Sequence, residues 1–158
     1  MIARLAACLV LALVATASAA HAAEITGPAH VIDASSIDIG GRPIRLYGIA
    51  APAESQICER NGAAWRCGQD ASWALAERLE RHWVLCDTMD DAAPEASTAI
   101  CYLGGRQGLD VAAWLVDQGW ALADPAASDY AAQEQAAQKT GRGLWAGKFE
   151  LPQLSQQP

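Results

Sequence analysis

The sequence has few basic side chains for its length. Its 158 residues contain 11 Lys and Arg against 18 Asp and Glu, which gives a formal net charge of −7. A general nucleic-acid binder needs many cationic side chains to displace the counterions of the phosphate backbone. The composition therefore disfavours that class of protein, although an enzyme could still hold one phosphate between a cation and a single arginine.

Several motifs that announce a catalytic or cofactor site are missing. The chain has no nucleophile elbow, no phosphate-binding loop and no dinucleotide fingerprint. It also lacks a Cys-x2-Cys pair, and His30 and His82 are isolated, so a zinc site is a weak alternative use of its cysteines. Beyond the first residues, no apolar run is long enough to span a membrane.

The first residues have the pattern of a secretion signal. Arg4 supplies a positive start, residues 5–14 form a short apolar run, and Ala17-Ser18-Ala19 and Ala20-His21-Ala22 offer cleavage sites. An uncleaved membrane anchor is the alternative, but the run is short for a spanning helix. Cleavage after Ala22 leaves 158 − 22 = 136 residues with a net charge of 10 − 18 = −8, because Arg4 is lost.

A chain of that length suits one domain. We expect a signal peptide over 1–22, a domain over 23–148 and a polar tail over 149–158. The protein is then exported, periplasmic or secreted, with no membrane span after cleavage, and we expect it to be a monomer.

Four cysteines remain after the signal, namely Cys58, Cys67, Cys86 and Cys101. An even number in an exported chain points to two disulfides, and three pairings are possible. Asn61-Gly62 predicts a turn between the first two cysteines, and the last two fall on strands that we expect to be neighbours. These positions favour the pairs Cys58–Cys67 and Cys86–Cys101.

Residues 36–46 predict a β-hairpin. Apolar and polar side chains alternate on both sides of Gly40-Gly41, which allows the positive φ angles of a primed turn. Pairing across this turn places Ile37 opposite Ile44 on one face, and Ser36 opposite Arg45 on the other. That second face could carry chemistry. The plain structural alternative for Arg45 is an exposed, weak ion pair with the diagonal Asp38.

Periodicity and turn residues outline the remaining elements. We expect strands over 29–32, 83–86 and 99–103, helices over 70–81, 111–118 and from 128 or 129 to 140, loops over 50–68 and 87–97, and an apolar plug at 144–145. Asp110 is the expected N-cap of the second helix, and Gly119 and Gly141 are the expected C-terminal glycines. The tryptophans are assigned to the core by default, with Trp65 the most exposed of them.

Residues 33–54 resemble the staphylococcal-nuclease-like (thermonuclease) family. That family typically reads Asp-Gly-Asp-Thr, a strand and a turn, and then Ile-Arg-Leu-x-Gly-Ile-Asp-x-Pro-Glu. The matching runs here are Asp33-Ala34-Ser35-Ser36 and Ile44-Arg45-Leu46-Tyr47-Gly48-Ile49-Ala50-Ala51-Pro52-Ala53. Weaker matches follow in order: Cys58-x8-Cys67-Gly68, Ala99-Ile100-Cys101-Tyr102, Gly119-Trp120-Ala121, Tyr130-x3-Glu134-x2-Ala137 and Gly143-Leu144-Trp145.

The resemblance selects a fold that periodicity alone leaves open. Five strands interrupted by a helix are compatible with a small Greek-key barrel, among other α+β arrangements. The family match implies a mainly β, α+β protein: a five-stranded OB-fold Greek-key barrel with three helices.

The resemblance also implies a catalytic constellation that this chain has mostly lost. Members that cleave phosphodiesters hold calcium with two aspartates, activate water with a glutamate and bind the phosphate with two arginines. Calcium prefers hard oxygen ligands, and the planar fork of arginine suits phosphate oxygens. Only Arg45 matches. The other positions are substituted, by Ser35 and Ala50 for the aspartates, Ala53 for the glutamate and Ala96 for the second arginine.

These substitutions predict an exported domain that is catalytically impaired or inactive. Alanine supplies no calcium ligand, and the acidic residues around Ala96 would repel a phosphate: Asp87, Asp90, Asp91 and Glu95. We therefore expect a binding module for a protein or another component of the cell envelope. It would use the former active-site face or the acidic loop, with weak or no nucleic-acid binding and no metal or other cofactor.

The alternative is an active secreted nuclease that hydrolyses DNA or RNA with Ca²⁺ in a rearranged site. Arg45 would bind the phosphate, and Glu54, one residue after the glutamate position, would replace the missing acid. Asp33 or Asp38 could lend an oxygen to the metal.

Overall fold

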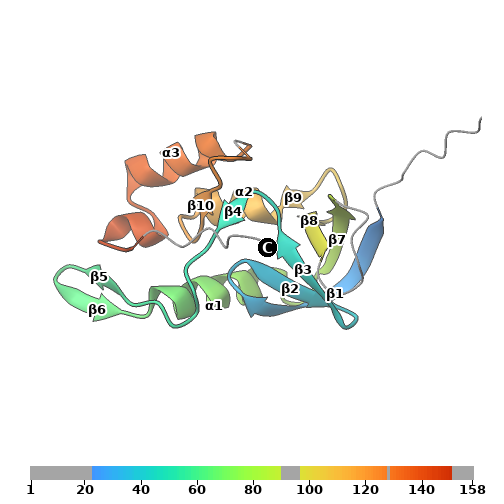
Figure 1. Cartoon of the computed structure of the whole chain (residues 1–158), viewed down its shortest axis with the longest axis horizontal. Helices are drawn as coiled ribbons and strands as arrows, with labels where there is room; N and C mark the ends of the chain where they lie inside the picture. The colour runs from blue at the N-terminus through green and yellow to red at the C-terminus, as the bar shows by residue number, and fades with distance from the viewer. Residues whose placement is uncertain (1–22, 90–96, 128, 151–158) are drawn as a thin grey trace, which may run out of the picture.

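The computed structural model describes residues 23–89, 97–127 and 129–150, and five of its strands form a closed barrel at one side of the molecule (Figure 1). Each strand pairs with its neighbour antiparallel except β3 and β8, which run parallel and close the barrel in the order β1-β2-β3-β8-β7. The five strands are β1 (Glu24–Asp33), β2 (Ser36–Ile39), β3 (Arg42–Leu46), β7 (Trp83–Thr88) and β8 (Ser97–Leu103). The order confirms the predicted OB-fold barrel.

Three helices and several short strands complete the described structure, as Figure 1 shows. The helices are α1 (Cys67–Leu79), α2 (Val111–Asp117) and α3 (Ala131–Thr140), followed by the 3₁₀ turn η1 (Gly143–Ala146). The short strands are β4 (Ile49–Ala50), β5 (Cys58–Arg60), β6 (Ala63–Trp65), β9 (Leu109–Asp110) and β10 (Leu122–Ala123). None of the helices in the described ranges is long and apolar enough to cross a membrane.

The hairpin of β2 and β3 forms as the sequence predicts. Ile37 pairs with Ile44 and both are fully buried, while Ser36 pairs with Arg45 on the other face. Gly40 and Gly41 have φ angles of 64° and 83°, as a primed turn requires. The alternation of the sequence therefore fixes which side chains enter the barrel.

Both predicted disulfides are present. Cys86 and Cys101 are direct partners in the β7–β8 pairing, with their Cα atoms 4.1 Å apart and both side chains buried. Cys58 and Cys67 join the start of β5 to the start of α1. The first pair lies inside the barrel, whereas the second closes the ribbon of β5 and β6, which Figure 1 shows extending away from the barrel beyond α1.

The expected loop over 50–68 is wrong in part. It contains β4 and the two-stranded ribbon β5–β6, because Asn61 and Gly62 adopt positive φ angles and turn the chain back on itself. Helix α1 begins at Cys67, three residues before the expected start, and ends at Leu79, where Arg81 with φ 63° reverses the chain. Helix α3 begins at Ala131 rather than at 128 or 129.

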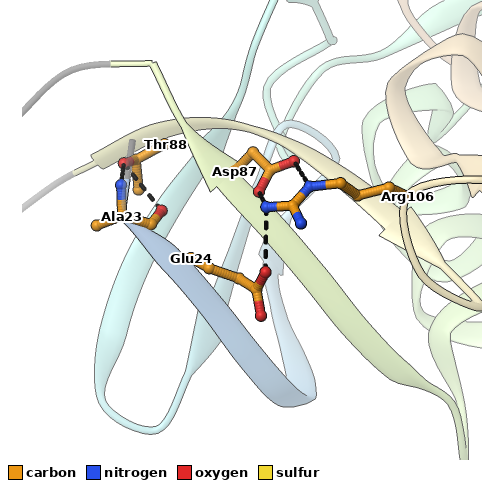
Figure 2. Close-up of polar contacts among 5 residues, drawn as sticks. All are labelled: Ala23, Glu24, Asp87, Thr88 and Arg106. Atoms are coloured by element: carbon orange, nitrogen blue, oxygen red, sulfur yellow. Dashed lines mark hydrogen bonds and ion pairs between the residues drawn. The ribbon is translucent and has the colours of Figure 1, made fainter. Parts of the chain in front are cut away.

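The expected loop from residue 87 is also shorter than predicted, since β7 continues to Thr88. Asp87 therefore belongs to a barrel strand and pairs with Glu24 and Ile100. The main chain of Ala23 continues this pairing, because its carbonyl accepts from Thr88 N at 3.0 Å. The Thr88 hydroxyl also accepts from Ala23 N and donates to Ala23 O, both at 3.0 Å (Figure 2). The other acidic residues of that loop, and Ala96, lie outside the described residues.

The expected order of tryptophan exposure is wrong. Trp65 is half-buried against Trp120, with ring centroids 6.3 Å apart, and the guanidinium of Arg60 lies 3.8 Å from its ring centre. Trp73 and Trp83 are instead 63% and 68% exposed. The ribbon packs against η1, so that Trp65 is partly buried beside Leu144 and Trp145. Local sequence does not reveal where so short a ribbon packs.

Candidate functional site

The β3–β4 face is defined by Ser35, Arg45, Ala50, Ala53 and Glu54, the residues on which the sequence-based expectations for the catalytic positions rest. Arg45 lies on β3 between two buried residues, so its side chain points outward and is exposed. It is paired in register with Ser36 of β2 and Thr98 of β8. The barrel thus presents Arg45 between two hydroxyl-bearing strands.

Ser35 lies in the tight connection between β1 and β2. Its N–H and its hydroxyl both donate to Asp33 Oδ1, at 2.7 Å and 2.8 Å, a local turn typical of aspartate. Its carbonyl accepts from Leu46 N at 2.8 Å, which ties the connection to the end of β3. This carboxylate oxygen of Asp33 is therefore engaged in holding the turn.

Ala50 lies in β4, where it pairs with Leu122 of β10 and is 8% exposed. The approach to β4 is fixed by Gly48, whose carbonyl accepts from Asp124 N at 2.8 Å. Gly48 has φ 74°, and a Cβ there would lie 2.9 Å from Cε2 of Tyr130. The backbone at the second aspartate position is therefore held from both sides, but its side chain is a methyl group.

Ala53 and Glu54 are exposed and follow the buried Pro52. Ala53 O accepts from Gln56 N at 2.8 Å, and the same oxygen packs against Gly68 in the first turn of α1. A Cβ on Gly68 would lie 1.8 Å from that oxygen, so only glycine allows this approach. The close contact with α1 fixes the path of the segment that carries Ala53 and Glu54.

The donor set of the β3–β4 face does not fit calcium. The two positions assigned to the metal-binding aspartates offer one hydroxyl group, from Ser35, and the methyl group of Ala50, and the position assigned to the glutamate offers the methyl group of Ala53. Calcium takes six to eight oxygen ligands and is held chiefly by carboxylates and carbonyls. Within residues 23–89, 97–127 and 129–150, no group of three or more His, Cys, Asp or Glu side chains is placed to hold a metal ion.

A partly buried polar cluster joins β8 to the starts of α2 and α3. Tyr130 is 4% exposed and its hydroxyl donates to Asp110 Oδ2 at 3.1 Å, while Asp110 Oδ1 caps α2 by accepting from Ala113 N at 3.0 Å. Burial, and then the charge of Asp110, raise the pKa of Tyr130 well above its ordinary value. The same two causes raise the pKa of Tyr102, which pairs with Asp110.

The sequence revealed only part of this cluster. It predicted the cap at Asp110, because an aspartate before an apolar helix is a local signal. It did not predict the second bond to Tyr130, since that residue lies 20 positions away and belongs to the start of another helix.

A second polar cluster lies on the outside of the barrel (Figure 2). Arg106 donates from Nε and Nη2 to the two carboxylate oxygens of Asp87, at 2.7 Å and 2.5 Å, and its Nη2 lies 3.1 Å from Glu24 Oε2. The hydrogen bond and charge of Asp87 raise the pKa of Arg106. The sequence did not reveal this cluster, because Arg106 and Asp87 are 19 residues apart and Asp87 was expected in a loop.

Comparison with known proteins agrees with the barrel fold described above. Residues 43–147 match the family model described as Staphylococcal nuclease homologue. The chain is also similar to the succinoglycan biosynthesis protein ExoI of Rhizobium meliloti (strain 1021), with 32% identity over 147 residues. That alignment covers 88% of this chain and 74% of that protein.

Proposed function

The chain belongs to the staphylococcal nuclease homologue family, and from this premise we propose that it is an exported binding module that has lost calcium-dependent phosphodiester cleavage. One observation carries the proposal. The backbone around the former site is held by specific contacts at Ser35, Gly48 and Gly68, but the positions assigned to the two aspartates and the glutamate carry a hydroxyl and two methyl groups.

The chemistry explains why those substitutions matter. Cleavage of a phosphodiester gains most from positive charge placed where negative charge develops. In the members of the family that cleave phosphodiesters, a metal ion and two arginines supply this charge. Without carboxylates to hold the cation, Arg45 is the single matched charge on the described part of the face. One arginine can bind an anion, but it neither generates a hydroxide nor neutralises the phosphate as the full set does.

Two observations support a role at the cell envelope. Two disulfides in a small domain are typical of proteins that fold in an oxidising compartment, in agreement with the secretion signal predicted for residues 1–22. The similar protein from Rhizobium meliloti is named for biosynthesis of succinoglycan, not for cleavage of nucleic acid. We infer an envelope component as the partner rather than DNA or RNA, which the acidic composition disfavours.

A nuclease assay tests the proposal. The full chain, matured by export, is incubated with single-stranded DNA and with RNA, once with Ca²⁺ and once with chelator. We expect equal, background cleavage in both conditions and no change in Arg45→Ala. Calcium-dependent cleavage that Arg45→Ala and Glu54→Gln both abolish would reject the proposal and support the active alternative.

A further inference from the structure

One face of the barrel, away from the β3–β4 face, combines exposed aromatic surface with fixed polar groups. In β7, Trp83, Leu85 and Asp87 alternate with the buried Val84 and Cys86, so they point out of the barrel. Their direct partners are Pro28, Thr26 and Glu24 on β1, with Tyr102 and Ile100 on β8. We call these eight residues, together with Arg106, the outer face.

Trp83 forms the apolar end of the outer face. It is 68% exposed, more than any other large hydrophobic side chain in the described ranges, and it begins β7 opposite Pro28. An exposed indole on a strand departs from the usual alternation, in which outward positions of a half-buried strand are polar. Burying so large a ring against a partner would stabilise a complex substantially.

The Asp87–Arg106–Glu24 cluster forms the polar end. One guanidinium holds both carboxylates, so their oxygens are fixed beside its N–H groups (Figure 2). Acceptors and donors thus lie side by side in a preformed arrangement, which lowers the entropy lost when a ligand binds. Hydroxyl groups, which both donate and accept, match such an arrangement.

The spacing of the two ends suits an extended ligand. Trp83 and Asp87 lie four residues apart on one strand, a distance of about 13 Å at the usual rise of a strand. Leu85 and Tyr102 lie between them and are half-buried. This is roughly the length of two linked sugar rings, whose flat C–H faces stack on aromatic side chains while their hydroxyl groups reach polar neighbours.

From these observations we propose that the outer face binds a neutral oligosaccharide chain, with one sugar stacked on Trp83 and another hydrogen-bonded to the Asp87–Arg106–Glu24 cluster. The proposal rests on the proposed function as a binding module and names the chemistry of its ligand. The face has two carboxylates against one guanidinium, so it repels polyanions such as nucleic acid. The centres of protein interfaces are depleted of Asp and Glu, which makes a protein a poorer fit.

The test uses the full chain, matured by export, and three neutral probes: cellohexaose, laminarihexaose and maltohexaose. Binding is measured by calorimetry and by tryptophan fluorescence. We expect at least one probe to bind, and Trp83→Ala to weaken it about tenfold or more, as loss of an aromatic anchor does. Trp73→Ala is the matched control, because Trp73 is 63% exposed on α1 and lies outside the face.

Three results would overturn the proposal. The first is no binding of any probe at about 1 mM, the weak end of specific affinity. The second is an equal loss in Trp73→Ala and Trp83→Ala. The third is self-association in light scattering that Trp83→Ala abolishes, which would make the face an interface between copies. Each of these leaves the nuclease assay unaffected, so failure here is distinct from failure of the proposed function.

Discussion

The β3–β4 face and the outer face belong to the same barrel but differ in the side chains that they present. On the β3–β4 face, close backbone contacts at Gly48 and Gly68 hold a frame whose ligand positions end in methyl and hydroxyl groups. On the outer face, a guanidinium fixes two carboxylates beside an exposed tryptophan. In both regions the backbone is held by the core and by close contacts, whereas the side chains that differ between the two faces lie on the surface.

The largest effects are expected from removing the two disulfides. One disulfide lies in the barrel that both faces share, and the other lies in the ribbon next to the β3–β4 face only. Removing the barrel disulfide as Cys86→Ala/Cys101→Ala should lower the free energy of unfolding by about 3 kcal/mol, the chain-entropy value for a loop of this size. Urea unfolding of the oxidised proteins measures this loss.

Removing the ribbon disulfide as Cys58→Ala/Cys67→Ala is the matched comparison. We expect faster hydrogen exchange over residues 51–60, which include Ala53 and Glu54 of the β3–β4 face, and unchanged exchange in β7 and β8, since the ribbon lies away from the barrel (Figure 1). Equal loss of protection in both regions would show that the two faces are not independent.

A smaller effect is expected from Gly68→Ala. Alanine normally favours a helix over glycine by about 1 kcal/mol, but here its Cβ would meet Ala53 O. We expect a net destabilisation of about 2 kcal/mol, within the range for overpacking. NMR shift changes should be confined to residues 51–56 and the start of α1. The neighbouring Gln69→Ala is the control, and a neutral Gly68→Ala would show that the segment moves freely.

The hydrogen bond from the buried Tyr130 to the half-buried Asp110 gives a third, smaller effect. Tyr130→Phe should cost about 1.5 kcal/mol, because it removes a hydrogen bond to a charged group. The folded state raises the pKa of Tyr130, so its contribution is complete below the unfolded value of about 10 and is lost as pH rises above that value.

Thermal unfolding between neutral pH and pH above about 10 tests this sign. The wild-type protein should lose stability with rising pH more steeply than Tyr130→Phe, with Tyr47→Phe as the control. Identical pH profiles for the wild type and Tyr130→Phe would contradict the account of this cluster.

The sequence predicted those parts of the molecule that depend on local chemistry. The alternation around Gly40-Gly41 defined the β2–β3 hairpin, and Asp110 marked the start of α2. Cys86 and Cys101 were paired correctly because they follow the register of two adjacent strands. The barrel itself required the family resemblance, since the parallel closure between β3 and β8 joins segments that share no local signal.

The outer face could not be predicted in the same way. The exposure of Trp83 depends on which face of β7 points into the barrel, and the partner of Asp87 comes from a turn 19 residues later. The identity of the residues at the β3–β4 face was evident from the sequence, but the contacts at Gly48 and Gly68 that maintain their backbone emerge only in three dimensions.

Calcium calorimetry tests most directly the central claim that the frame is intact and only the charges are missing. We compare the wild type with Ser35→Asp/Ala50→Asp/Ala53→Glu, and with Ser55→Asp/Ala63→Asp/Ala64→Glu, which adds the same charge at exposed positions. We predict saturable heat of binding in the first variant alone, with its stability raised by Ca²⁺ because a carboxylate at the buried position 50 needs a cation. Saturable binding by the wild type, or none by a first variant that circular dichroism shows to be folded, would contradict the claim.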